Sequence, residues 1–127
     1  MYRKEVLFMN KVILSGRLTA DTETRKVDKT SVTTFSIAVR RNFKNSTGSY
    51  DTDFIRCEAW GVVGENISKL FKKGSGIEIV GSWLTGKYEK NGVAIYINNC
   101  RVESFSYPVS YESKNSETVN DNVPFIT

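Results

Sequence analysis

Histidine is absent from this chain, and cysteine and proline occur only twice each. Without histidine the chain lacks the usual general base, the commonest zinc ligand and every arrangement in which histidine activates serine or cysteine. It also lacks a Gly-rich phosphate loop ending in Lys-Ser/Thr and a Cys-x-x-Cys pair. A carboxylate or metal-assisted site stays open, but no motif indicates one, and we predict that the protein is not an enzyme.

Long apolar runs are also missing. No segment approaches the roughly 18 to 20 apolar residues that span a bilayer. The apolar patch within residues 1–9 is shorter than the core of a secretory signal, and no small-residue cleavage site follows it. We therefore expect a cytoplasmic protein with no membrane partner. In that compartment Cys57 and Cys100 are expected to be buried thiols rather than a disulfide.

Charge is unevenly distributed along the chain. The formal net charge is +4, and residues 106–127 alone carry three acidic side chains and one lysine. The body of the protein is therefore more basic than the total suggests. A basic body with a mildly acidic end favours a polyanionic partner.

The stretch 52–61, Thr-Asp-Phe-Ile-Arg-Cys-Glu-Ala-Trp-Gly, alternates with the period of a β-strand. Ile55, Cys57 and Ala59 form a small apolar face. The opposite face carries Phe54, Arg56, Glu58 and Trp60. If the apolar face packs on a core, the aromatic rings and the arginine are exposed together, as stacking on unpaired bases and neutralising phosphates requires. The alternative is a strand that is buried on both faces.

The chain is long enough for one domain with a single core. Apolar spacing predicts strands at residues 12–19, 33–41, 52–61, 76–87 and 93–105, and a helix at residues 62–71. Residues 88–92 are expected to form a hairpin tip. This order predicts an all-β OB-fold, a five-stranded Greek-key barrel with one short helix between strands three and four. A disordered C-terminal tail is expected to follow it.

In this fold, strands two and three and two of the connecting loops form the nucleic-acid face. The predicted stacking residues on those elements are Phe43, Phe54, Trp60 and Tyr88. A barrel also points aromatic side chains inward, and Phe35 and Phe71 are better placed in the core. Trp83 is assigned to the core as well, although its position between two glycines leaves its place ambiguous.

From about Asn10 to Phe105 the chain resembles the bacterial and phage single-stranded DNA-binding proteins. The resemblance is carried by Asn-Lys-Val-Ile-Leu-Ser-Gly-Arg-Leu at 10–18, Phe-Ser-Ile-Ala-Val at 35–39, Thr-Asp-Phe-Ile-Arg-Cys at 52–57, and Lys-Gly-Ser at 73–75 followed by Val-Gly at 80–81. It implies a sequence-independent coat of single-stranded DNA in replication, recombination and repair, with no cofactor or metal. It also implies a homotetramer in the bacterial cytosol or nucleoid, or in a phage-infected cell.

The resemblance also covers individual residues. The family's stacking aromatics are matched by the four residues named above, with Phe43 and Phe54 at positions where tryptophan is common. Its basic positions are matched by Lys11, Arg56 and Lys73. Strand and loop placement adds further candidate phosphate contacts at Arg40, Lys44 and Lys87.

Both ends of the chain depart from the family pattern. Residues 1–9 precede the expected start of the domain at residues 10–107, and their status stays open. Residues 108–127 are similar to the family's acidic tail, and Pro124 and Phe125 match its Pro-Phe motif. By resemblance this motif docks on replication and repair proteins, but two further residues follow it here. The alternative is a frayed terminus with a chance Pro-Phe.

Two other functions stay open at this point. An OB-fold with this face could bind RNA, because stacking and phosphate contacts do not depend on the 2′-hydroxyl group. The aromatic face could instead bind a protein, as in a primosome-type adaptor.

Overall fold

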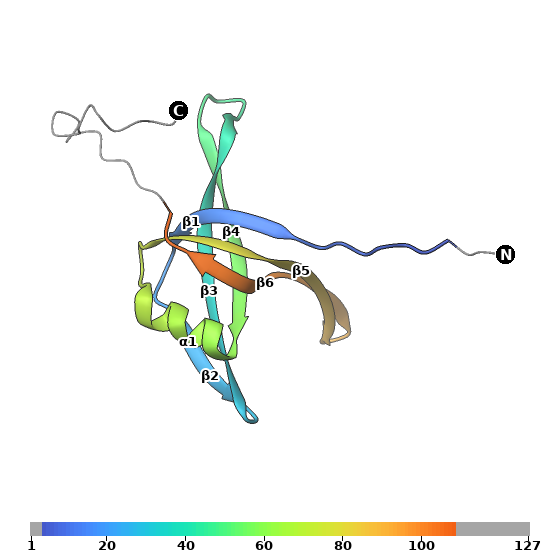
Figure 1. Cartoon of the computed structure of the whole chain (residues 1–127). Coiled ribbons are helices and arrows are strands. Elements are labelled where there is room, and N and C mark those ends of the chain that lie inside the picture. Colours follow the sequence, from blue (N-terminus) through green and yellow to red (C-terminus); the bar gives the residue numbers. More distant parts are fainter. Residues whose placement is uncertain (1–3, 109–127) are drawn as a thin grey trace.

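The computed structural model describes residues 4–108. The predicted tail, with Pro124 and Phe125, lies outside the described residues apart from its first position. Within residues 4–108 the elements are β1 (Val12–Leu18), β2 (Glu23–Val27), β3 (Thr30–Lys44), β4 (Tyr50–Trp60), α1 (Gly61–Leu70), β5 (Gly76–Lys90) and β6 (Val93–Ser106) (Figure 1). No helix in this part of the chain is long and apolar enough to cross a membrane.

Five of the strands close into a barrel. The strand order is β1-β5-β6-β4-β3-β2, and pairing of β1 with β3 at Arg17 and Leu18 joins the two ends. The strand β4 runs parallel to β6, and the other pairs are antiparallel. With α1 placed between β4 and β5, this topology confirms the predicted OB-fold. The additional strand β2 pairs only with β3 and occupies part of the polar stretch that follows β1.

Closure depends on a close approach of β1 to β3. A Cβ atom added to Gly16 would overlap the backbone carbonyl oxygen of Ala38. Glycine is therefore the residue that lets the two backbones come together at this point.

The barrel interior is apolar, as the strand alternation predicts. Ile37, Ile77 and Ile79 are fully buried, and α1 covers the core with Ile67. Phe35 and Phe71 are buried, which confirms both core predictions. The core prediction for Trp83 is wrong, because this side chain is 37% exposed. It lies on β5 opposite Cys100, just beyond Gly81, the last buried residue of this strand.

Both cysteines are buried free thiols, as expected. Cys57 and Cys100 are register partners on the parallel strands β4 and β6. Burial raises the pKa of each thiol, since desolvation disfavours the thiolate.

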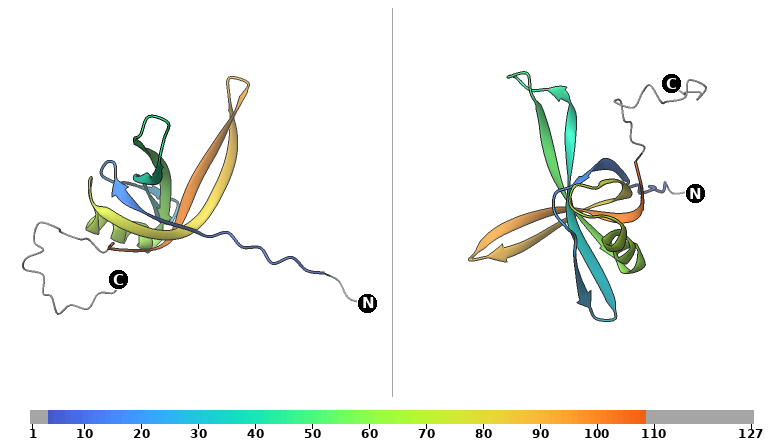
Figure 2. Two further views of the ribbon diagram at one scale, coloured as in Figure 1. Left: turned by 90° about the horizontal axis from the view of Figure 1, so that it is seen from above. Right: turned by 90° about the vertical axis from the view of Figure 1, so that its left-hand side faces the viewer.

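Three hairpins project from the barrel, β2–β3, β3–β4 and β5–β6 (Figure 2). The strand β2 was not predicted, and β3, β4, β5 and β6 are longer than predicted. Strand β5 continues to Lys90. The hairpin tip is therefore not residues 88–92 but the pair Asn91-Gly92, with φ angles of 53° and 79°. Positive φ at both central positions is typical of a two-residue type I′ turn, which keeps the flanking strands paired up to the turn. As a result Tyr88 lies within β5, paired with Ile95.

Candidate nucleic-acid interface

The outer face of β4 carries the predicted aromatic and basic side chains. Cys57 and Ala59 are fully buried on the inner face of this strand. On the outer face Phe54 is 70% exposed, Arg56 is exposed and Trp60 is half-buried. The strand is therefore not buried on both faces, and two aromatic rings and a guanidinium group lie along one accessible surface.

A groove of about 470 Å³ borders this face, and we refer to it below as the groove. It lies between β4, the β2–β3 hairpin and the β5–β6 hairpin, and its lining includes Arg25, Arg56, Trp60 and Tyr88. Three residues predicted from the sequence are thus brought together from distant parts of the chain. The groove has a guanidinium group near its aromatic rings, which is the combination that single-strand binding uses.

A smaller hollow of about 210 Å³ also lies next to Arg56. Its lining includes Thr19 and Asp21 from the β1–β2 connection. The backbone N–H of Lys73 donates to the Asp21 carboxylate at 2.8 Å, so Lys73 lies beside this hollow. Arg56 lines both the groove and the hollow.

Two of the predicted phosphate contacts meet on the β3–β4 hairpin. The guanidinium carbon of Arg40 lies over the ring of Tyr50, 4.6 Å from the ring centroid. The Nζ atom of Lys44 lies 6.0 Å from the same centroid. Within residues 4–108 neither cation is ion-paired with a carboxylate. Phe43 is 59% exposed on the same hairpin. This hairpin therefore adds two cations and two aromatic rings to one end of β4.

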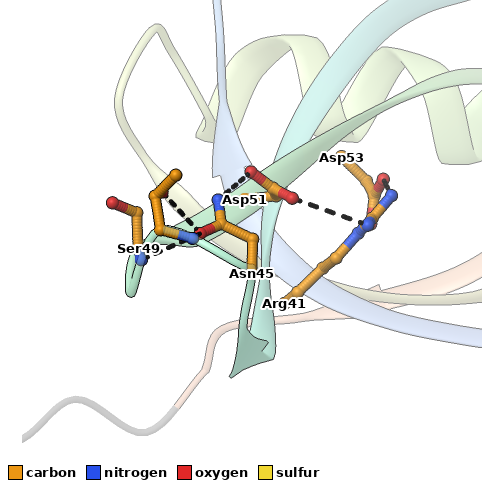
Figure 3. Close-up of polar contacts among 6 residues, drawn as sticks. Arg41, Asn45, Ser49, Asp51 and Asp53 are labelled. Carbon is orange, nitrogen blue, oxygen red and sulfur yellow. Dashed lines mark hydrogen bonds and ion pairs between the residues drawn. The ribbon is translucent and has the colours of Figure 1, made fainter.

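Polar contacts hold the same hairpin in shape (Figure 3). Arg41 donates two hydrogen bonds to Asp53, of 3.0 and 2.8 Å, and this pairing lowers the pKa of the Asp53 carboxyl. The Asn45 side chain donates to Asp51 and accepts from the backbone N–H of Ser49. Arg41 is thus occupied by a structural ion pair, whereas the neighbouring Arg40 is not.

The two remaining predicted cations lie outside the groove lining. Lys11 is ion-paired with Glu103 on β6. Lys87 is exposed on β5 and lies opposite Tyr96. A phosphate contact by Lys11 would have to compete with its carboxylate partner.

Sequence reasoning did not select several side chains of this surface. Ile95 and Ile97 alternate as the core residues of a strand would, but they line the groove because the β5–β6 hairpin extends beyond the barrel. The other unselected side chains are Arg25 and Tyr96 in the groove, Tyr50 under Arg40, and Arg101 near Trp60. Arg25 could have been selected from the sequence, because it is a basic residue in the polar stretch that follows β1.

The barrel and its groove place this protein in the class of nucleic-acid-binding OB-fold proteins. Residues 9–107 match the model of the single-strand binding protein family, and the chain belongs to this family, which confirms the predicted resemblance. It is 32% identical over 114 residues to the single-stranded DNA-binding protein of Staphylococcus epidermidis, which covers 90% of this chain and 86% of the relative. Over 111 residues it is 40% identical to single-stranded DNA-binding protein 3 of Streptococcus agalactiae, covering 86% of this chain and 78% of the relative. Over 119 residues it is 37% identical to single-stranded DNA-binding protein 1 of Streptococcus pyogenes, covering 91% and 92%.

Proposed function

We propose that this protein binds single-stranded DNA without sequence preference and acts by binding rather than catalysis. The observation that carries the proposal is the outer face of β4, where Phe54 and Trp60 flank Arg56 beside a groove that also contains Tyr88. Every base has an aromatic face, so stacking on these rings tolerates any sequence. Family membership and the names of the relatives support DNA as the ligand.

In this proposal the single-stranded DNA runs along β4 from the β3–β4 hairpin to the groove. Bases stack on Phe43, Phe54, Trp60 and Tyr88, and the phosphates meet the surrounding cations. Arg56 has the most central position, since it lines both the groove and the smaller hollow. The other proposed phosphate contacts are Arg40, Lys44, Lys73, Lys87 and, in competition with Glu103, Lys11. Neutralising phosphates releases counterions, so affinity should fall steeply as salt rises.

A competition titration tests the ligand. A labelled dT oligonucleotide is bound first, and unlabelled dT, unlabelled U of the same length and a DNA duplex are then added separately. The proposal predicts that dT competes best and that the duplex competes poorly, because its bases are not available for stacking. Stronger competition by the RNA would favour the RNA-binding alternative. Failure of the labelled dT itself to bind at low salt, before any competitor is added, would point to the protein-adaptor alternative.

We also propose that the protein coats and protects DNA in the cytoplasm during replication, recombination and repair, as a homotetramer. The apolar residues Val6–Met9 and Ile13 are at least 71% exposed, which supports burial in an assembly. Light scattering on the purified protein measures the assembly directly. A monomer at micromolar concentration would contradict it.

The tail proposal concerns residues outside those described. We propose that residues 10–107 suffice for DNA binding and that Pro124 and Phe125 dock on replication and repair proteins. Deleting residues 108–127 should then leave the affinity for dT unchanged and abolish binding to such a partner. Loss of DNA affinity on deletion would contradict this division of the chain.

A further inference from the structure

The indole ring of Trp60 is held by a short chain of hydrogen bonds that runs through Glu58 to Asn99. The Trp60 Nε1–H group donates to Oε2 of Glu58 at 2.8 Å. The other carboxylate oxygen, Oε1, accepts a hydrogen bond of 3.0 Å from Nδ2 of Asn99. The guanidinium carbon of Arg101 lies 5.5 Å from the Trp60 ring centroid. The ring is therefore connected to β4 through Glu58 and to β6 through Asn99.

The orientation of Asn99 follows from its contact with Glu58. Its Nδ2 group donates to the carboxylate, while its Oδ1 atom is buried and has no partner within residues 4–108. Turning the amide over would place the Asn99 carbonyl oxygen against the carboxylate, and the hydrogen bond would be lost because both oxygens are acceptors. The bond to Glu58 is therefore kept even though the other amide atom is left unpaired.

A carboxylate is an unexpected side chain on this surface. Glu58 lines the groove beside Arg25 and Arg56, where its negative charge repels the phosphates that the arginines attract. Electrostatics alone would favour a neutral residue at this position. Glu58 does accept two hydrogen bonds, one on each carboxylate oxygen, and one of them comes from the Trp60 ring.

We propose that Glu58, held by Asn99, is a positioning residue that fixes the Trp60 ring in the orientation that stacks on a base. This inference rests on the proposed function and adds to it the residue that prepares the stacking surface. A ring that is already ordered loses less conformational freedom when the base arrives, so a fixed ring binds more tightly than a mobile one.

Two substitutions of Glu58 separate positioning from charge. Glu58→Gln removes the charge but keeps a carbonyl oxygen for the indole N–H, and its NH2 group can donate to Oδ1 of Asn99 once that amide turns over. Glu58→Ala removes the charge and both hydrogen bonds. We expect Glu58→Gln to bind a dT oligonucleotide at least as tightly as the unsubstituted protein. Glu58→Ala should bind about two- to tenfold more weakly than Glu58→Gln, the range for ordering one side chain. Equal affinities of the two variants would overturn the proposal.

A double-substitution cycle tests whether Glu58 acts through the indole. Trp60→Phe keeps an aromatic ring but removes the N–H donor. In that background Glu58→Ala and Glu58→Gln should bind DNA equally, because no hydrogen bond from Glu58 to the ring is left to lose. A difference between them that persists would show that Glu58 acts by another route and would overturn the proposal. Thermal melts of each variant establish that it is folded.

A measurement without DNA keeps this inference separate from the proposed function. In a Trp83→Phe background, Trp60 is the only tryptophan, so its fluorescence anisotropy reports the mobility of its ring. Glu58→Ala should lower this anisotropy and Glu58→Gln should not. An unchanged anisotropy in Glu58→Ala would overturn the positioning role. Failure of the unsubstituted protein to bind dT would instead overturn the proposed function.

Discussion

Replacing Phe54 with alanine separates a binding role from a structural role at the centre of the proposed interface. The ring is 70% exposed, so it contributes little to the core. Substitutions at such surface positions usually change the free energy of unfolding by no more than about 0.5 kcal/mol. The same change at Phe35, which is 6% exposed, should cost about 3–5 kcal/mol. The Phe54→Ala protein is therefore expected to fold normally.

The effect on DNA binding should be much larger than the effect on folding. One stacked base contributes about 1–3 kcal/mol, which corresponds to a loss of about 5- to 160-fold in affinity. No charge is removed, so the slope of log K against log salt concentration should stay the same. Weakening without a change in slope is characteristic of a lost stacking contact.

The assay is a fluorescence titration with oligo-dT at two salt concentrations. Leu70→Ala is the matched control, since it also removes a large apolar side chain that is 52% exposed, but from α1. Thermal melts establish that both variants are folded. A folded Phe54→Ala protein with the same affinity as Leu70→Ala would refute the assignment of this face.

Three further predictions address phosphate contact, the buried thiols and barrel closure. Arg56→Ala should weaken binding and reduce the magnitude of the salt slope by about 0.7, as expected for one lost contact on a single strand; an unchanged slope would contradict a phosphate contact. Because burial raises the pKa of Cys57 and Cys100, these thiols stay neutral in the folded state at pH values where the unfolded chain ionises. The free energy of unfolding should therefore fall above about pH 8.5, by up to about 1.4 kcal/mol per pH unit for each thiol, and a constant value in urea titrations up to pH 10 would contradict their burial. Gly16→Ala should destabilise the barrel by about 1–3 kcal/mol in a thermal melt, because its methyl group would overlap the Ala38 carbonyl oxygen, and an unchanged melting temperature would contradict the close approach.

Local alternation was sufficient to predict the barrel strands and the two faces of β4. A strand has a period of two, so the apolar side of residues 55–59 determines which side carries Phe54, Arg56 and Trp60. The order of strands and helix then predicted the barrel. These features depend on neighbouring residues along the chain.

The groove could not be predicted in the same way, because it depends on contacts between distant elements. Ile95 has the pattern of a core residue, and only the length of the β5–β6 hairpin places it in the groove. The contact between Glu58 and Asn99 depends on the pairing of β4 with β6, which joins residues 41 positions apart. Trp83 was misplaced for a related reason, since strand alternation does not show where a strand leaves the core.

The central claim is that single-stranded DNA binds across the outer face of β4. The most direct measurement is a titration of a Trp83→Phe protein with dT oligonucleotides of increasing length at two salt concentrations, so that Trp60 alone reports. The account predicts strong quenching that weakens at the higher salt and saturates at a length several times the ~4–16 nucleotides that one such barrel covers. Absence of both quenching and binding at low salt would contradict it.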